Sequence, residues 1–301
     1  MRTSRTTSGL LLAFLGVLGF SFSLPWTVWA LESFAPVMTA TGRAVIAGVV
    51  AGVILLIRRV PWPDRSLMRP LIFTMAGAVF GWPILIALAL ERTTAAHAAV
   101  IAAIMPLVTA VFAVLRTGER VARQFWIAAV AGTAALVVFA LLRGGGDGGN
   151  LVADLLIVGA VLASSWCYVE GASLTKVMPG WQVISWVVVL ALPITVPVTV
   201  VLALTGGVTT PVTTQAWIGM AFLGLVSVYF AFFAWYQGLS MAGVARGAQT
   251  QQLQAPLTLL WSALLLGEVI TWPTVAAAFV IVGCVAWAVR VRTPTVAAPE
   301  E

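Results

Sequence analysis

Long apolar segments make up most of the chain, and short stretches of proline, glycine and charged residues separate them. Each segment is apolar on all sides and close to the ~20 residues that an α-helix needs to cross a bilayer. Strands of a membrane β-barrel would instead alternate polar and apolar residues over about ten positions. The pattern therefore predicts ten membrane-spanning helices, numbered here as spans one to ten: residues 9–31, 36–57, 67–90, 94–115, 123–142, 151–174, 182–204, 215–239, 246–266 and 272–290.

The composition indicates a membrane protein and excludes a soluble one. Of the 301 residues, 61% are hydrophobic and only 9% are charged, whereas about 25% of the residues in a soluble protein are charged. The apolar run from Leu10 to Ala30 is too long for the core of a signal peptide, so we expect it to be the first spanning helix. Cys167 and Cys284 lie in apolar segments without metal-ligand spacing, and we expect no metal, cofactor or disulfide.

The basic residues fall mostly on one side of the predicted bundle. The net charge is +6, but its distribution follows the positive-inside rule, which explains it better than nucleic-acid binding does. Only Arg92 and Arg143 fall in connections on the other side, and Arg43 falls inside a span. We therefore expect a multi-pass protein of a bacterial inner membrane with both termini in the cytoplasm. The basic side carries Arg2, Arg5, Arg58, Arg59, Arg65, Arg69, Arg116, Arg120, Arg123, Lys176, Arg246, Arg290 and Arg292.

A glycine-rich segment at the middle of the chain separates two halves of five spans each. The predicted organisation is a first repeat over residues 1–143, a linker over 144–150, a second repeat over 151–292 and a cytoplasmic tail over 293–301. An odd number of spans in each half turns the second half upside down in the membrane. Inverted repeats of this kind are typical of secondary transporters.

The glycine-rich segment also contains a GxGD string that ends at Asp147 and occurs in intramembrane aspartyl proteases. That chemistry needs a second aspartate on a facing helix. Asp64 and Asp154 lie at the edges of spans instead, and we therefore do not expect an enzyme.

The two halves share a local pattern around a proline. Span four contains Pro106 and span nine contains Pro256, at an offset of about 150 residues. An apolar stretch and a Gly-Glu pair follow each proline, at Gly118-Glu119 and Gly267-Glu268. A proline removes one backbone donor and permits a kink. We expect Pro106 and Pro256 to act as hinges, with static helix curvature as the alternative.

This set of motifs resembles the drug/metabolite transporter superfamily, and within it the ten-helix EamA-type branch. The shared features are the two prolines, the Gly-Glu pairs, the glycine-containing spans that follow them, and Arg43 in span two. The resemblance implies an all-α membrane protein built from two inverted five-helix repeats. Within the branch the chain is most similar to YddG-type exporters of aromatic and other amino acids, which implies outward transport.

Aromatic residues near the span centres are the first candidates for a substrate site. In the functional interpretation they line a central cavity, stack a substrate ring and donate hydrogen bonds. In the alternative interpretation they pack against other helices or face lipid. The candidates are Trp82, Trp166, Tyr168, Tyr229 and Phe233.

The remaining aromatic residues fall into two groups, one along span eight and one near the ends of spans. Phe222 and Tyr236 share the helical face of Tyr229 and Phe233, so span eight is predicted to present one aromatic stripe. Tryptophans near span ends are expected to be interfacial anchors. These are Trp62, Trp181, Trp217, Trp272 and Trp287.

Polar side chains in span nine are a further set of candidates, because amide groups in hydrocarbon need partners. At 100° per residue Gln249 and Gln252 share one face, and Gln251 and Gln254 share the opposite one. We expect one pair to bind neighbouring helices and the other to face substrate, so that Gln252 or Gln254 contacts it. The sequence leaves open which face is which.

Ionisable residues supply the remaining candidates. His97 is the only histidine; a substrate contact, a proton carrier and a neutral hydrogen-bonded group are its possible roles. Glu170 is expected in an ion pair near the surface, close to Lys176. Arg43 is expected to be a structural anchor paired with Glu32 or backbone carbonyls, with attraction of a substrate carboxylate as the alternative.

The predicted function is that of a secondary transporter, because the sequence has no GxxxxGK[ST] string for binding ATP. We expect a monomer that exports small metabolites, foremost aromatic and other neutral amino acids, by alternating access around a central aromatic cavity. A carrier of drugs, sugars or nucleosides with the same fold is the first alternative. An intramembrane enzyme is the alternative from another class.

Overall fold

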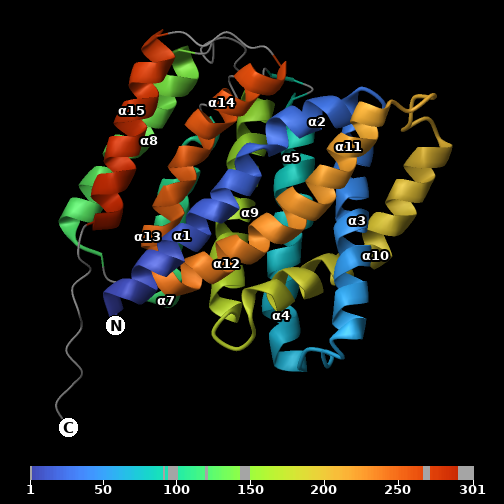
Figure 1. Ribbon diagram of the computed structural model, residues 1–301, viewed down its shortest axis with the longest axis horizontal. Helices are drawn as coiled ribbons and strands as arrows, with labels where there is room; N and C mark the ends of the chain where they lie inside the picture. Colours follow the sequence, from blue (N-terminus) through green and yellow to red (C-terminus); the bar gives the residue numbers. More distant parts are fainter. Residues whose placement is uncertain are drawn as a thin grey trace.

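The computed structural model describes residues 2–90, 92–93, 101–118, 121–142, 150–266 and 272–290, and these form an all-α bundle (Figure 1). In the first half, span one consists of two helices separated at Phe22, and span three contains a π-helical segment, η1. The helices are α1 (Arg2–Ser21), α2 (Ser23–Leu31), α3 (Pro36–Ile57), α4 (Arg65–Met75), η1 (Ala76–Gly81), α5 (Trp82–Leu90), α7 (Met105–Thr117) and α8 (Arg123–Leu142).

The second half has a matching series of helices. Span eight contains a second π-helical segment, η2, and span nine contains a 3₁₀-helical segment, η3. The helices are α9 (Leu151–Leu174), α10 (Gly180–Leu204), α11 (Thr214–Phe222), η2 (Leu223–Phe230), α12 (Ala231–Ala242), α13 (Val244–Ala248), η3 (Gln249–Leu253), α14 (Gln254–Leu266) and α15 (Trp272–Arg290).

Length and apolar composition identify most of these helices as membrane spans. Within the described residues, six helices are long and apolar enough to cross a bilayer, and three further apolar helices are shorter. The long ones correspond to spans one, two, three, six, seven and eight, and the shorter ones to spans four, five and ten. The expected all-α membrane fold is confirmed.

Each span of the first half packs against a span of the second half. The most extensive contacts among the described residues join α1 to α12 and α3 to α10, followed by α15 with α8 and α5 with α9. Figure 1 shows α8 and α15 side by side at the left of the bundle. The pairing of span one with span eight has its counterpart in the pairing of span three with span six, as a pseudo-two-fold axis between inverted repeats requires.

Irregular helix geometry also recurs at equivalent places in the two halves. The π-helical segments η1 and η2 lie in spans three and eight, and the adjacent spans four and nine are both interrupted. Span four contains a turn at residues 103 and 104, and span nine changes to 3₁₀ geometry in η3. Both interruptions come directly before the repeat-related prolines, Pro106 and Pro256.

The helix ends follow from local sequence chemistry. The side chain of Asn150 accepts hydrogen bonds from the backbone N–H groups of Val152 (3.0 Å) and Ala153 (3.2 Å), which fixes the start of α9. Gly118 ends α7 with a left-handed φ of 69°, a conformation that glycine adopts at little cost. This explains the glycine of the first Gly-Glu pair, whereas Glu119, Gly267 and Glu268 lie outside the described residues.

Two sides of the bundle can be distinguished. Figure 1 shows the α3–α4 and α9–α10 connections at the same lower edge, and these carry Arg58, Arg59 and Lys176. We call this edge the arginine-rich side. At the opposite edge, hydrogen bonds join the α2–α3 turn to the α10–α11 connection: Ala35 N donates to Gly207 O (2.9 Å) and Thr209 N donates to Ser33 O (2.8 Å).

Small residues allow the helices to approach closely, as is usual for helices that pack within a membrane. In the α1–α12 contact, a Cβ atom added at Gly16 would lie 2.9 Å from both Ala231 O and Trp235 Cβ. A Cβ atom added at Gly238 would meet the backbone of Ala13 at still shorter range. The contact between the two repeats therefore depends on these glycines.

We expect Gly16→Ala and Gly238→Ala to destabilise the protein by about 1–3 kcal/mol each, because the new methyl groups overlap backbone atoms that cannot move aside. The thermal midpoint of the purified protein in detergent should fall by on the order of 5 °C. Gly283→Ala is the control, because a Cβ atom there would have no neighbour within 4 Å. Unchanged midpoints for both α1–α12 variants would contradict this packing.

Candidate functional site

A cluster of aromatic side chains occupies the contact between α1, α9 and α12. We call it the central aromatic cluster; ring-centroid distances are 4.9 Å for Phe20–Phe232, 5.4 Å for Tyr168–Trp235 and 5.4 Å for Phe232–Tyr236. Phe232, Trp235 and Tyr236 share one face of α12 because they are spaced at i, i+3 and i+4. A Cβ atom at Gly171 would overlap the ring of Tyr236, so this glycine lets the ring lie directly against α9.

The glutamines of span nine connect its interruption to that of span four. In η3 the 3₁₀ geometry places Gln249 and Gln252 one above the other, and Gln252 Nε2 donates to Gln249 Oε1 (2.7 Å). Gln249 Nε2 in turn donates to the carbonyl of Pro106 (3.3 Å). Gln249 and Gln252 thus share a face, and through Gln249 this pair joins span nine to span four.

Gln251 points in a different direction, towards the central aromatic cluster. Its Nε2 lies 3.4 Å from Tyr168 Oη and 3.2 Å from Met105 Sδ, and it donates to both. Gln254 begins α14 and is partly buried. The cluster is thus lined by one amide from span nine as well as by aromatic rings from spans one, six and eight.

Three polar atoms around this cluster are buried without a hydrogen bond to a described oxygen or nitrogen atom: Trp235 Nε1, Tyr236 Oη, which interacts with the weakly polar thiol of Cys167, and Gln251 Oε1. Trp235 and Tyr236 have no exposed surface at all. Leaving a buried polar atom unpaired costs about 1–3 kcal/mol. An indole donor, a phenol and an amide acceptor thus lack such a partner at the centre of the bundle, and because both rings have no exposed surface, a ligand would reach them only if the helices moved apart.

The aromatic candidates predicted from the sequence do not all lie at one site. Tyr168 belongs to the central aromatic cluster, whereas Tyr229 in η2 is hydrogen-bonded to Ser185 of α10, with 2.8 Å between the two oxygens. Trp82 and Phe233 are partly buried and pack against the same hydrophobic core. His97 lies outside the described residues.

The aromatic stripe expected along span eight does not remain on one face. Phe222 stacks on Trp26 of α2 with a centroid distance of 4.5 Å, Tyr229 faces α10 and Tyr236 faces α9. The π-helical segment η2 lies between Phe222 and Tyr236 and changes the rotation per residue, so an α-helical period does not apply across it.

Sequence reasoning missed Phe20, Phe232 and Trp235 as members of the central aromatic cluster. The i, i+3, i+4 spacing of Phe232, Trp235 and Tyr236 is visible in the sequence. It would have identified the face of α12 that joins the cluster if residues 231–242 had been treated as a separate helix. Phe20 has no such signal, because its role depends on the packing of α1 against α12.

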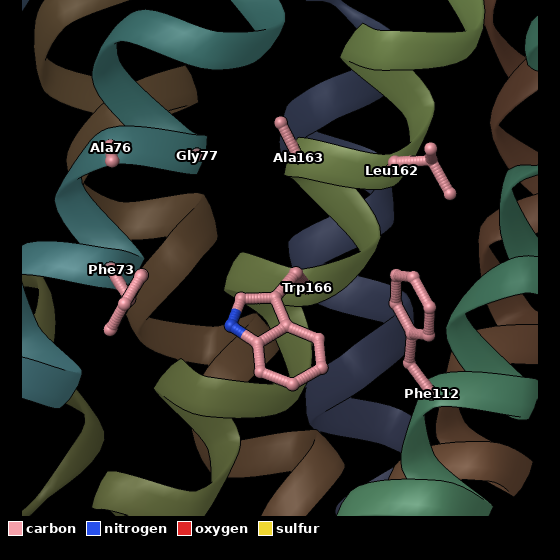
Figure 2. A pocket seen from close by; sticks show the side chains of 7 residues that line it. All are labelled: Phe73, Ala76, Gly77, Phe112, Leu162, Ala163 and Trp166. Atoms are coloured by element: carbon pink, nitrogen blue, oxygen red, sulfur yellow. The ribbon is translucent and has the colours of Figure 1, made fainter.

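Trp166 lies elsewhere, in an apolar groove of about 370 Å³ between spans three, four and six (Figure 2). Its ring meets Phe112 of α7 edge to face, with a centroid distance of 5.4 Å. Trp166 and Tyr168 are only two residues apart on α9, but about 200° of helical rotation separates them. We name this the Trp166 groove; it is lined by Phe73, Ala76, Gly77, Phe112, Leu162, Ala163 and Trp166.

An ion pair lies one turn beyond the groove. Arg116 Nε donates to Glu170 Oε1 (2.7 Å), and Arg116 Nη2 lies 3.5 Å from Glu170 Oε2. The Glu170 side chain is 5% exposed and that of Arg116 is 48% exposed. The expected ion pair of Glu170 is therefore confirmed, but its partner is Arg116 on span four rather than Lys176, and the pair joins the two repeats.

Arg43 has a different environment from the one expected. Glu32 accepts a hydrogen bond from Thr213 Oγ1 (3.0 Å), and Arg43 forms no hydrogen bond or ion pair with the described residues. Its side chain is partly buried within α3. A guanidinium held partly out of water without a partner is costly, and the expected pairing of Arg43 with Glu32 is wrong.

Comparisons with known proteins agree with this architecture. The model of the EamA-like transporter family matches residues 7–141 and 151–290. The uncharacterized transporter YdeK of Bacillus subtilis (strain 168) is 39% identical over 287 residues, which cover 95% of this chain and 99% of that protein. A crystal structure of a protein with 21% identity superposes with a TM-score of 0.79 over 95% of this chain and 99% of that one; this likeness concerns the fold alone.

We expect Arg116→Gln to destabilise the protein by on the order of 3 kcal/mol, because it leaves the buried Glu170 carboxylate without its partner; this is the lower end for buried pairs, since Arg116 is half exposed. Glu170→Gln should lower the free energy of unfolding less than Arg116→Gln does. The double variant Arg116→Gln/Glu170→Gln should recover most of the stability that Arg116→Gln loses. Denaturation of the four proteins in one detergent measures this coupling. Strictly additive losses would show that the two side chains do not interact.

Proposed function

The chain belongs to the EamA-like transporter family, and we propose that it exports small, neutral, amphipathic metabolites, foremost aromatic and other neutral amino acids. The observation that carries this proposal is the central aromatic cluster with its three unpaired polar atoms. Rings from three spans form an apolar surface for a substrate ring, and the indole, phenol and amide groups are suited to its polar part.

The absence of charge at this site limits the kind of substrate. Tyr168, Trp235, Tyr236 and Gln251 are all neutral, and an ion of one sign buried among them would lose its hydration without compensation. A zwitterion brings the opposite charge within the same molecule, and an uncharged molecule has no ionic hydration to lose. Arg43 lies in the first half of α3, and we propose that it attracts a substrate carboxylate, which favours amino acids over sugars.

Alternating access would use the interrupted spans. Discontinuous helices at the interface of inverted repeats are where transporters bind substrate, and here the interruptions before Pro106 and Pro256 meet through Gln249. We propose that Pro106 and Pro256 are the hinges, because the chain on either side of each interruption can tilt without breaking a continuous helix. The arginine-rich side would face the cytoplasm of a bacterium, with both termini on that side.

Transport by the purified protein in liposomes tests this proposal directly. With a panel of labelled amino acids, sugars and nucleosides, we expect saturable flux of aromatic amino acids down their gradient. The flux should persist without a proton or sodium gradient, because no residue of the central site changes charge near neutral pH. Transport of sugars or nucleosides only, or an absolute need for either ion gradient, would contradict the proposal.

Tyr236→Phe separates a binding role of this residue from a packing role. The variant removes only a hydroxyl whose described partner is the weakly polar thiol of Cys167, so thermal stability should be nearly unchanged. Apparent substrate affinity should fall about tenfold if that hydroxyl binds substrate, as one hydrogen bond is worth about 1–1.5 kcal/mol. Trp272→Phe serves as the control, since this side chain is 77% exposed. Equal affinities of Tyr236→Phe and wild type would exclude the hydroxyl from the site.

A further inference from the structure

The Trp166 groove is open to the membrane rather than to the centre of the bundle. Phe73 and Leu162, on its two flanks, are 46% and 44% exposed, and Figure 2 shows Phe73 and Phe112 on either side of Trp166. Every lining residue is apolar. The groove narrows at Gly77, where a Cβ atom would overlap the backbone of Ala163, so η1 and α9 close its inner wall.

Two arginines lie one helical turn from this groove, both towards the arginine-rich side. Arg69 precedes Phe73 by four residues on α4, and its Cζ atom lies 5.9 Å from the centroid of the Phe73 ring. Arg116 follows Phe112 by four residues on α7, which runs in the opposite direction to α4. Each arginine therefore lies on the same helical face as the phenylalanine of its helix that lines the groove.

Both guanidinium groups retain donors for an anion. Arg69 is exposed and lies over the aromatic face of Phe73, and among the described residues it has no hydrogen-bond acceptor, which leaves all five of its N–H groups available. Arg116 directs Nε and Nη2 towards Glu170 but keeps its other donors, and its side chain is 48% exposed. The pair with Glu170 also fixes the Arg116 side chain, so its free edge points in a constant direction.

We propose that this surface binds one anionic phospholipid of the leaflet on the arginine-rich side. The phosphate is held by Arg69 and Arg116, and one acyl chain lies in the Trp166 groove. The depths agree: at 1.5 Å per residue the groove begins about 6 Å from Arg69, at Phe73, and extends to about 12 Å, at Gly77. An acyl chain enters the hydrocarbon directly below its phosphate, and arginines at that depth attract anionic headgroups.

The site requires both parts of the lipid. A free phosphate would gain only exposed contacts with arginines, which salt screens. An acyl chain with a zwitterionic headgroup would fill the groove but would bring no net charge to two guanidinium groups. The combination selects an anionic diacyl lipid, and phosphatidylglycerol is the simplest probe of that class.

Native mass spectrometry of the purified full chain, titrated with dioleoyl-phosphatidylglycerol and dioleoyl-phosphatidylcholine, tests the proposal. Wild type should bind the first phosphatidylglycerol at least fivefold more tightly than phosphatidylcholine. Arg69→Gln should weaken phosphatidylglycerol binding about fivefold, which corresponds to about 1 kcal/mol for one arginine near the membrane surface. Arg290→Gln, which removes an exposed arginine of α15 far from α4, should change nothing.

The acyl chain is tested separately. Ala76 is exposed and lines the groove, so Ala76→Trp should fill it and weaken the binding of both dioleoyl lipids at unchanged thermal stability. Dihexanoyl-phosphatidylglycerol should bind at least tenfold more weakly than the dioleoyl form, because its chains bury less apolar surface. Equal affinity for the two headgroups, or no effect of Arg69→Gln, would overturn the proposal.

Discussion

The hydrocarbon core of a membrane offers no water to hydrogen-bond the backbone, so each N–H and C=O group must find a partner within the protein. Prolines inside spans break this rule locally, and the structure shows how one such loss is compensated. Pro25 cannot donate to the carbonyl of Ser21, and Thr258 Oγ1 of span nine donates to it instead (2.8 Å).

The same constraint explains why the polar residues lie where the helices are irregular. Gln249 donates to the carbonyl of Pro106, in the first turn of α7 and next to the turn that interrupts span four. The two repeats are alike in backbone, with π segments in spans three and eight, but unlike in side chains. Counting from the two prolines, the first repeat has Ile101, Ala102 and Ile104 where the second has Gln251, Gln252 and Gln254. The glutamines beside the central aromatic cluster therefore come from the second repeat only, although the two repeats have similar backbones.

Hydropathy was sufficient to predict the spans, because a segment that crosses the lipid must be apolar along its whole length. The bounds of spans two, five and six were predicted as residues 36–57, 123–142 and 151–174, and α3, α8 and α9 have those bounds. The site was predicted less well because it depends on hydrogen-bond register, which hydropathy does not encode. Tyr168 was correctly placed among aromatic residues near the centre, but the π turns of η2 separated Phe222, Tyr229 and Tyr236. The 3₁₀ turn of η3 set the direction of Gln251, and only packing against α12 revealed Phe20.

Helix α9 joins the two surfaces on which this protein offers binding groups. Trp166 and Glu170 share one face, towards the Trp166 groove and Arg116, and Tyr168 lies on the other, towards Trp235 and Gln251. A regular helix of 24 residues moves as one body, so a tilt that widens the central site must also change the groove. Two ligands that each prefer one tilt would then affect each other's affinity by the same factor, in either direction. If both proposed sites are occupied, the lipid bound at one face of α9 would therefore change the affinity for substrate at its other face.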